Sequence, residues 1–285
     1  MKKILIPVDF SARSKTAIEL AAVIAKKSKA GVRLIHVLID PYVFLSVPNS
    51  YLTPIIDTEV QADYINKLEK SSHVNLKKLA SIPALKSIKV SSEVITGGSI
   101  YREVLNYSEK YKPDMIIMGT NGAKSFGEIF LGTNAERIIR FTSIPVLVVG
   151  QKIAKPAIHN IVFASKFDDA ASYAFDFINN FAKMFKAKIH LLRMNTKDDF
   201  VPAQEAIEQI KKFIKNHKGN YEIAVNEAYE IDEGIVKYAK SIKADIISLG
   251  VHRRSGPARF FTDRITEGVL RLTGIPVLGV DIPKK

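Results

Sequence analysis

Glycines follow an apolar run in the first half of the chain, at a spacing that suits phosphate binding. The run Met115–Met118 is apolar, and the segment after it has the pattern Gly119-x2-Gly122-x9-Gly132, where x is any residue. A helical pattern begins at the next residue, Thr133. A strand, a glycine-spaced loop and a helix start can together hold a phosphate, because glycines let the backbone approach closely and free N–H groups attract negative charge. The segment is not a Walker A motif, since it lacks the Gly-Lys-Ser/Thr sequence.

Each residue of this pattern also has a structural interpretation. Thr133-Asn-Ala-Glu136 fits a capping box, in which the hydroxyl caps the helix and the glutamate returns a hydrogen bond. We expect Thr133 to serve both roles. The glycines could simply end a strand and form turns, but their combined spacing favours phosphate binding. Lys124 lies within the loop, and nothing in the sequence fixes the direction of its side chain.

Composition restricts the class of protein. The 285 residues are enough for two domains, and 47% of them are hydrophobic, as in globular proteins. The chain has no apolar run long enough to span a bilayer and no cysteine, so we expect a cytoplasmic protein without disulfides or thiolate metal sites. The net charge of +13 could attract a phosphate-bearing partner. Its lysines are scattered through helical stretches, which favours a solvated basic surface and argues against nucleic-acid binding.

The chain carries one pattern twice. The run Lys3–Asp9 aligns with Asn160–Lys166, and Ile144–Val149 aligns with Ile275–Val280. The offset between the copies is constant on either side of a single gap, which is typical of a duplication. We therefore expect a first domain over residues 1–150, a linker over 151–157 and a second domain over 158–285.

Strands and helices alternate within the first copy. We expect strands at Lys3–Val8, Val32–Val37, Lys89–Ile95, Asp114–Met118 and Val146–Val149. We expect helices at Ser14–Lys29, Asp57–Ser81, Ser99–Tyr111 and Thr133–Thr142. The strands are almost unbroken runs of Val, Ile and Leu, as in a parallel sheet that is covered on both faces. The alternation predicts an α/β fold of two tandem Rossmann-like domains, each doubly wound around a five-stranded parallel sheet.

In such folds, ligands bind at the carboxyl ends of the strands, where the strand order reverses. Asp9 lies just past the first strand, Val37 ends the second and Gly119 ends the fourth. If the first and fourth strands are neighbours, the three residues face one crevice. The carboxylate of Asp9 could accept a hydrogen bond from an adenine amino group. Alternatively, Asp9 could help to start the first helix, as we expect of Ser11 or Ser14.

These residues resemble the universal stress protein family. The resemblance rests on the glycine motif, on Asp9 and on the pair His36-Val37, and it covers essentially the whole chain as a tandem of two domains. In ATP-binding members of the family, the aspartate and the backbone near the His-Val pair contact adenine. Residues around the first glycine hold the ribose, and the later glycines and the hydroxyl hold phosphates. The resemblance thus implies an ATP or ADP site at Asp9, Val37, Met118, Gly119, Gly122, Gly132, Thr133 and Asn134. Metal involvement is left open, since a bound nucleotide could bring its own magnesium.

The resemblance also implies a way for the two halves to associate. Domains of the family commonly pair through their last strands, and an edge strand requires a cover or a partner. We therefore expect Val146–Val149 to pair with Val277–Val280, which would make a pseudo-twofold dimer from one chain. A further homo-oligomer is left open.

The second copy keeps Gly250 at the position of Gly119 but departs from the motif at other positions that align. Lys166 replaces Asp9, Arg253 replaces Gly122, and Asp263 and Arg264 replace Gly132 and Thr133. We therefore expect the second half to bind no ATP and to act as a structural or regulatory mate. Its arginine cluster could bind another anion or an acidic partner; its members are Arg253, Arg254, Arg259 and Arg264. The alternative is surface charge with intramolecular salt bridges, for example from Lys166 or Arg264 to nearby acids.

The sequence therefore predicts an ATP-binding stress-response protein with one competent site, which acts as a nucleotide-dependent sensor or switch. Two alternatives stay open. One is a slow ATPase, autophosphorylating enzyme or phosphotransferase that uses Lys124 and magnesium. The other is an interaction module that binds an anionic partner and no nucleotide. No Ser-His-Asp motif can be assembled locally, and we expect His36 to be a hydrogen-bonded strand residue and not a metal ligand.

Overall fold

The computed structural model describes residues 1–40, 58–120, 133–150, 157–251 and 264–282. It divides the chain into two compact units, Met1–Ile117 and Met118–Lys285. The loop between residues 40 and 56 and most of the expected linker lie outside the described residues. No helix in the described part of the chain is both long and apolar enough to cross a membrane.

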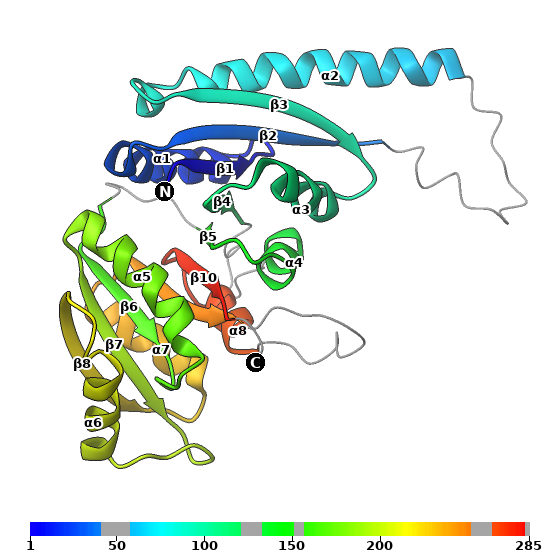
Figure 1. The fold of residues 1–285 in the computed structure, drawn as a ribbon. Coiled ribbons are helices and arrows are strands. Elements are labelled where there is room, and N and C mark those ends of the chain that lie inside the picture. The colour runs from blue at the N-terminus through cyan, green and yellow to red at the C-terminus, as the bar shows by residue number, and fades with distance from the viewer. Residues whose placement is uncertain (41–57, 121–132, 151–156, 252–263, 283–285) are drawn as a thin grey trace, which may run out of the picture. The chain divides into compact units, whose positions relative to one another are not determined.

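The first unit has alternating strands and helices. Its elements are β1 (Lys3–Pro7), α1 (Ala12–Ser28), β2 (Gly31–Ile39), α2 (Thr58–Ala80), a short 3₁₀ helix (Pro83–Leu85), β3 (Val90–Gly97), α3 (Ile100–Tyr111) and β4 (Met115–Gly119), whose end passes into the second unit. The strand order is β3-β2-β1-β4, and all of these pairs are parallel. Figure 1 shows α2 alongside β3. The expected neighbours β1 and β4 are therefore confirmed.

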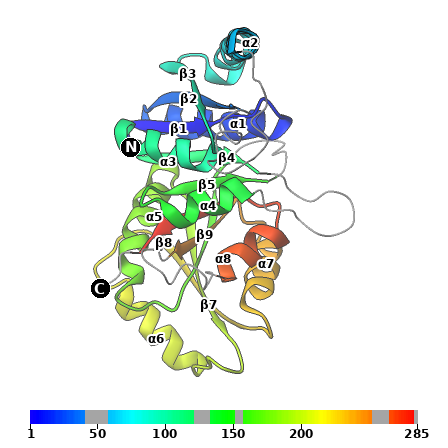
Figure 2. The same ribbon diagram turned by 90° about the vertical axis from the view of Figure 1, so that its right-hand side faces the viewer.

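The second unit repeats this pattern. Its elements are α4 (Thr133–Phe141), β5 (Val146–Val149), β6 (Asn160–Ala164), α5 (Ala171–Phe185), β7 (Lys188–Asn195), α6 (Ala203–Phe213), β8 (Asn220–Glu227), α7 (Ile231–Ser241), β9 (Ile246–Val251), α8 (Arg264–Leu272) and β10 (Val277–Asp281). The strand order is β5-β10-β9-β6-β7-β8. Helices α7 and α8 pack against each other, as Figure 2 shows.

The expected pairing of the last strands is confirmed. Strand β10 pairs with β5 in antiparallel orientation, with Leu278 opposite Leu147. Every other strand pair whose register the described residues define is parallel. The pairing covers the apolar strand β5, which is buried along its whole length. The α/β fold built from two Rossmann-like halves is thus confirmed, with one antiparallel strand pair in an otherwise parallel arrangement.

The predicted elements of the first half agree with the structure to within two residues at their ends. Helix α1 starts at Ala12 because the Ser11 side chain accepts a hydrogen bond from the backbone N–H of Ser14 and caps the helix. The second strand runs on to Ile39, so Val37 lies within β2 and does not end it.

Both halves keep the same structural devices. Asp114 accepts hydrogen bonds from the backbone N–H groups of Lys2 and Lys3 at the start of β1. Its counterpart, Asp245, accepts hydrogen bonds from the N–H groups of His159 and Asn160 at the start of β6. Each carboxylate therefore ties together the starts of two parallel strands. Both copies have therefore kept an aspartate that joins two neighbouring strands.

Candidate functional site

Asp9 lies at the carboxyl end of β1 and is bound to the start of α1. Its Oδ1 accepts a hydrogen bond of 3.0 Å from the Ser11 N–H and one of 2.5 Å from the hydroxyl of Ser14. Burial acts to raise the pKa of Asp9, but the hydrogen bonds from Ser11 and Ser14 outweigh it and hold the pKa below its ordinary value. The carboxylate is therefore ionised at neutral pH and fixed in direction. The helix-start interpretation of Asp9 is confirmed, since both serines take part.

His36 and Val37 lie next to Asp9 in the first unit. The His36 Nδ1–H donates a hydrogen bond of 2.8 Å to the Val8 carbonyl, which fixes the proton on that nitrogen because a carbonyl only accepts. The ring of His36 also contacts the ring of Phe10, with centroids 4.3 Å apart. His36 is thus a hydrogen-bonded strand residue, as expected. Val37 is buried in β2, with an exposed fraction of 8%.

The turn after the first strand has an unusual backbone. Phe10 has a φ of 63°, a value that bulky residues rarely adopt. Its counterpart Phe167 has a φ of 58°. Because the second half keeps this backbone conformation without the aspartate, the positive φ is a feature of the fold and does not depend on Asp9.

The remaining candidates lie around β4 and α4. Met118 is buried in β4, and Gly119 is the last residue of that strand, as expected. Thr133 is the first residue of α4, and the next residue, Asn134, is half-buried. Gly122 and Gly132 lie outside the described residues, as do Lys124 and the arginines at 253, 254 and 259. The structure thus places Asp9 just past β1 and Val37 in the neighbouring strand β2. A shared site for these residues and the phosphate candidates remains a prediction.

Glu136 has a partner of its own in the structure. The capping-box interpretation assigns its carboxylate to the start of α4. Its Oε1 lies 2.5 Å from Nη2 of Arg140, one turn further along the helix. The same Arg140 nitrogen lies 2.7 Å from Oε2 of Glu267 in α8. Arg140 therefore pairs with Glu136 within α4 and links α4 to α8 through the carboxylate of Glu267.

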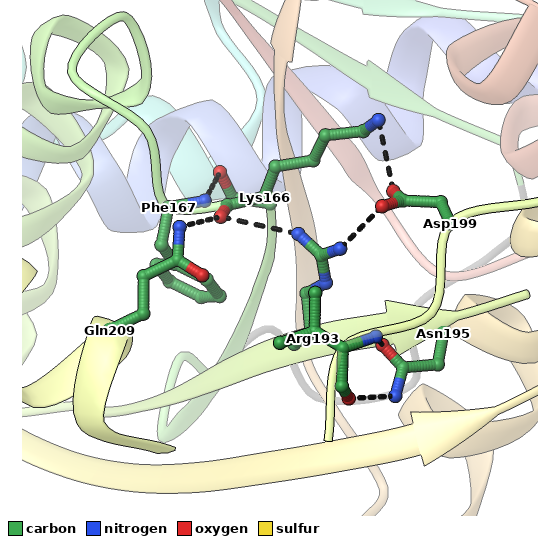
Figure 3. A network of polar contacts seen from close by, with 8 residues as sticks. Lys166, Phe167, Arg193, Asn195, Asp199 and Gln209 are labelled. Carbon is green, nitrogen blue, oxygen red and sulfur yellow. Dashed lines mark hydrogen bonds and ion pairs between the residues drawn. The ribbon is translucent and has the colours of Figure 1, made fainter. Parts of the chain in front are cut away.

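In the second half, Lys166 occupies the position that aligns with Asp9. It belongs to an internal ion-pair network (Figure 3). The Lys166 ammonium lies 2.9 Å from Oδ2 of Asp199. Nη2 of Arg193 donates to Oδ1 of the same carboxylate at 2.7 Å. The Lys166 carbonyl in turn accepts hydrogen bonds from Nη1 of Arg193 and from the side chain of Gln209. A salt bridge from Lys166 to a nearby acid, one of the two interpretations of this region, is thus confirmed.

Arg193 is the buried cation of this network, and the sequence analysis did not single it out. It aligns with His36 and is only 4% exposed within β7. A single charged residue inside the apolar run Leu191–Met194 is the signal that could have identified it. Burial acts to raise the pKa of Asp199, but the hydrogen bond from Lys166 and the charges of Arg193 and Lys166 together hold it below its ordinary value.

Comparisons with known proteins agree with the duplicated architecture. The family model of the universal stress protein family matches residues 1–150 and 157–281. Universal stress protein MJ0531 of Methanocaldococcus jannaschii is 35% identical over 150 residues, which are 52% of this chain and 81% of that protein. Universal stress protein Slr1230 of Synechocystis is 24% identical over an alignment of 290 residues, which covers 98% of this chain and 99% of that protein.

A solved structure has the same fold over nearly the full length. A universal stress protein from Archaeoglobus fulgidus aligns with a TM-score of 0.75, covering 98% of this chain and 96% of that one. At 18% identity, this likeness concerns the fold alone. The two matched segments, the repeated structural devices and the full-length relatives lead to one conclusion: the chain belongs to the universal stress protein family, as a tandem of two family domains.

Proposed function

We propose that the protein binds ATP or ADP at one site, in its first half, and acts as a nucleotide-dependent sensor or switch. The contrast between Asp9 and its counterpart Lys166 is the observation that carries this proposal. Asp9 is an ionised and oriented acceptor at the carboxyl end of β1. Lys166 presents a donor at the matching position and is paired with Asp199.

The chemistry of adenine supports this assignment. The exocyclic amino group of adenine is a donor and requires an acceptor. Both described hydrogen bonds to the Asp9 side chain end on Oδ1, so Oδ2 is the oxygen proposed to receive the amino group. The Lys166 ammonium at the matching position is a donor, so it cannot accept a hydrogen bond from the adenine amino group. The second half is therefore proposed to bind no ATP.

The proposed phosphate contacts come from the glycine motif. Gly122 and Gly132 would let the backbone approach the phosphates, and Thr133 and Asn134 at the start of α4 would offer N–H groups to them. Met118 and Gly119, at the end of β4, would contact the ribose. Magnesium would be brought by the nucleotide, with its charge balancing the phosphates.

We also propose that the duplicated units correspond to residues 1–150 and 158–285, joined by a linker at 151–157. The two segments matched by the family model support this division. The nucleotide site would then belong to the first domain alone. The second domain would be its structural or regulatory mate.

Calorimetric titration with ATP and magnesium tests the proposal. Wild type should bind one nucleotide per chain, and both Gly132→Val and Asp9→Ala should weaken binding by at least about tenfold, which corresponds to ~1.4 kcal/mol. Asp63→Ala serves as the matched control, because Asp63 pairs only with Lys67 on the surface of α2 among the described contacts. Absence of binding in wild type, or full affinity in both variants, would contradict the proposal.

A further inference from the structure

The second half contains a pocket at the carboxyl ends of its central strands. The pocket has a volume of about 270 Å³ and lies where β6 and β9 are neighbours. Strand order reverses at this point, since β6 is followed by β7 on one side and β9 pairs on the other. The walls are mainly apolar, with the largest side chains from Leu192, Met194, Ile231, Ile235, Leu249 and Ile282. The site is thus a lined chamber at the position where folds of this type bind ligands.

The size of the pocket limits its occupant. A cavity of roughly 150 Å³ holds a benzene molecule, and drug-sized ligands occupy pockets of roughly 300 Å³ or more. A volume of about 270 Å³ therefore suits one ring or a short chain with a small head group. Met194, Ile235 and Leu249 are each less than 7% exposed, so they form a firm apolar wall. A compact apolar body fits this chamber, and a nucleoside triphosphate does not.

The polar edge of the pocket offers one ammonium, that of Lys166, beside the carboxylates of Asp168 and Asp199. Two cations, Lys166 and Arg193, share the single carboxylate of Asp199. Arg193 is buried and holds Oδ1 of Asp199, so this carboxylate keeps a partner if Lys166 turns to a ligand. The Lys166 side chain is 63% exposed, and its ammonium has three donors, of which Asp199 engages one. Asp168 also lines the pocket, but its Oδ1 accepts from the Ala171 N–H at the positive end of α5.

A wider polar recess adjoins the pocket and shares Lys166, Asp199 and Ile231 with it. Its further charged residues are the acids Asp198, Glu230 and Asp232 and the bases Lys197 and Arg264. Because acids outnumber bases among these residues, a multiply charged anion would meet repulsion beyond the Lys166 ammonium. The acids of the recess therefore favour a ligand with a single negative charge, placed at the Lys166 ammonium.

We infer that this pocket is a second ligand site, and that it binds a small apolar monocarboxylate whose carboxylate is held by the Lys166 ammonium. The apolar body lies against β7, β9 and α7, and the carboxylate lies at the edge next to Asp199. This site is independent of the proposed nucleotide site, because all of its residues belong to the second half. The same substitution that removes the adenine acceptor therefore creates a carboxylate donor.

Methyl NMR of the full chain with phenylacetate as the probe tests this inference. The δ1-methyl signals of Ile231, Ile235 and Ile282 should shift and saturate on titration. Lys166→Met should raise the dissociation constant for phenylacetate by about tenfold or more, as expected from the loss of a charge-assisted hydrogen bond. Phenylacetamide, a neutral molecule of the same shape, should bind wild type and Lys166→Met equally within about twofold, which also reports that the variant pocket is intact.

Two further variants serve as controls for the charge of Lys166. Lys183→Met removes an exposed lysine from α5 and should leave phenylacetate binding unchanged. Lys166→Arg keeps the positive charge and should retain most of the affinity. The inference is overturned if neither probe shifts the three methyl signals, if phenylacetate and phenylacetamide respond alike to Lys166→Met, or if phenethylamine binds more tightly than phenylacetate. It is also overturned if ATP displaces phenylacetate from the pocket.

Discussion

Replacement of Asp199 by asparagine should destabilise the protein more than replacements of residues near the surface usually do. Arg193 is 4% exposed, and the Asp199 carboxylate is its charged partner at 2.7 Å. A hydrogen bond to a charged group contributes about 1.5–3 kcal/mol, and loss of one partner of a fully buried ion pair costs about 3–5 kcal/mol. The Asp199 side chain is 29% exposed, so solvent reduces the larger figure. We expect Asp199→Asn to cost about 2 kcal/mol at pH 7, or on the order of 4–8 °C in Tm for a unit of this size.

The pH dependence of this loss follows from the lowered pKa of Asp199. A carboxyl group whose folded pKa is depressed stabilises the fold above its unfolded pKa, which is about 4. That contribution is lost as the pH falls through the folded pKa. The difference in unfolding free energy between wild type and Asp199→Asn should therefore be constant from about pH 5 to pH 8 and should shrink below about pH 4.

Urea unfolding followed by far-UV circular dichroism measures the effect, since the chain has no tryptophan to report on it. Asp198→Asn is the matched control, because Asp198 is the exposed neighbour and should change stability by less than about 0.5 kcal/mol. Arg193→Met combined with Asp199→Asn should cost less than the sum of the single changes, because no buried charge is left unpaired. Equal costs for Asp199→Asn and Asp198→Asn, or strict additivity in the double variant, would refute the reasoning.

Three further predictions follow from individual contacts. Arg140→Met should cost about 1–3 kcal/mol in urea unfolding, because Arg140, Glu136 and Glu267 are each at most 20% exposed, whereas Arg271→Met should cost less than about 1 kcal/mol because Arg271 is 56% exposed; equal costs would disprove the assignment. Ser14→Ala should raise the pKa of Asp9 toward its ordinary value in an NMR titration, and an unchanged pKa would show that Ser14 does not hold the carboxylate. Ultraviolet titration of wild type, compared with that of Glu93→Gln, should give a pKa of about 12 for Tyr107, because burial and the hydrogen bond from Tyr107 to Glu93 raise it. Glu93→Gln should lower this pKa, and an unchanged titration curve would reject that cause.

The fold could be predicted from the sequence because its signals are local and repeated. Each strand of the first half is a short apolar run, and each helix end has a cap or a polar break within a residue or two of the predicted position. The pairing of β5 with β10 was implied by the family resemblance, and the need of an apolar edge strand for a partner supports it. The end of β2 was less predictable, because Leu38 and Ile39 continue the apolar run beyond the expected boundary.

The network of the second half was only partly predictable. Lys166 was identifiable because it replaces an aspartate at an aligned position, and a salt bridge to a nearby acid was one expectation for it. Arg193 was not, because its role depends on Asp199, which lies in the connection between β7 and α6 and has no counterpart pattern in the first half. Such contacts between a strand and a connecting segment are set by tertiary structure and leave no periodicity in the sequence.

The asymmetry between the two halves is the central claim, and photo-crosslinking with 8-azido-ATP tests it most directly. Peptides of the irradiated wild-type protein would be mapped by mass spectrometry, with excess ATP as the competitor. The account predicts ATP-protected label in peptides of residues 1–150 alone, and no such label in Asp9→Ala. Protected label in peptides of residues 158–285 would contradict it.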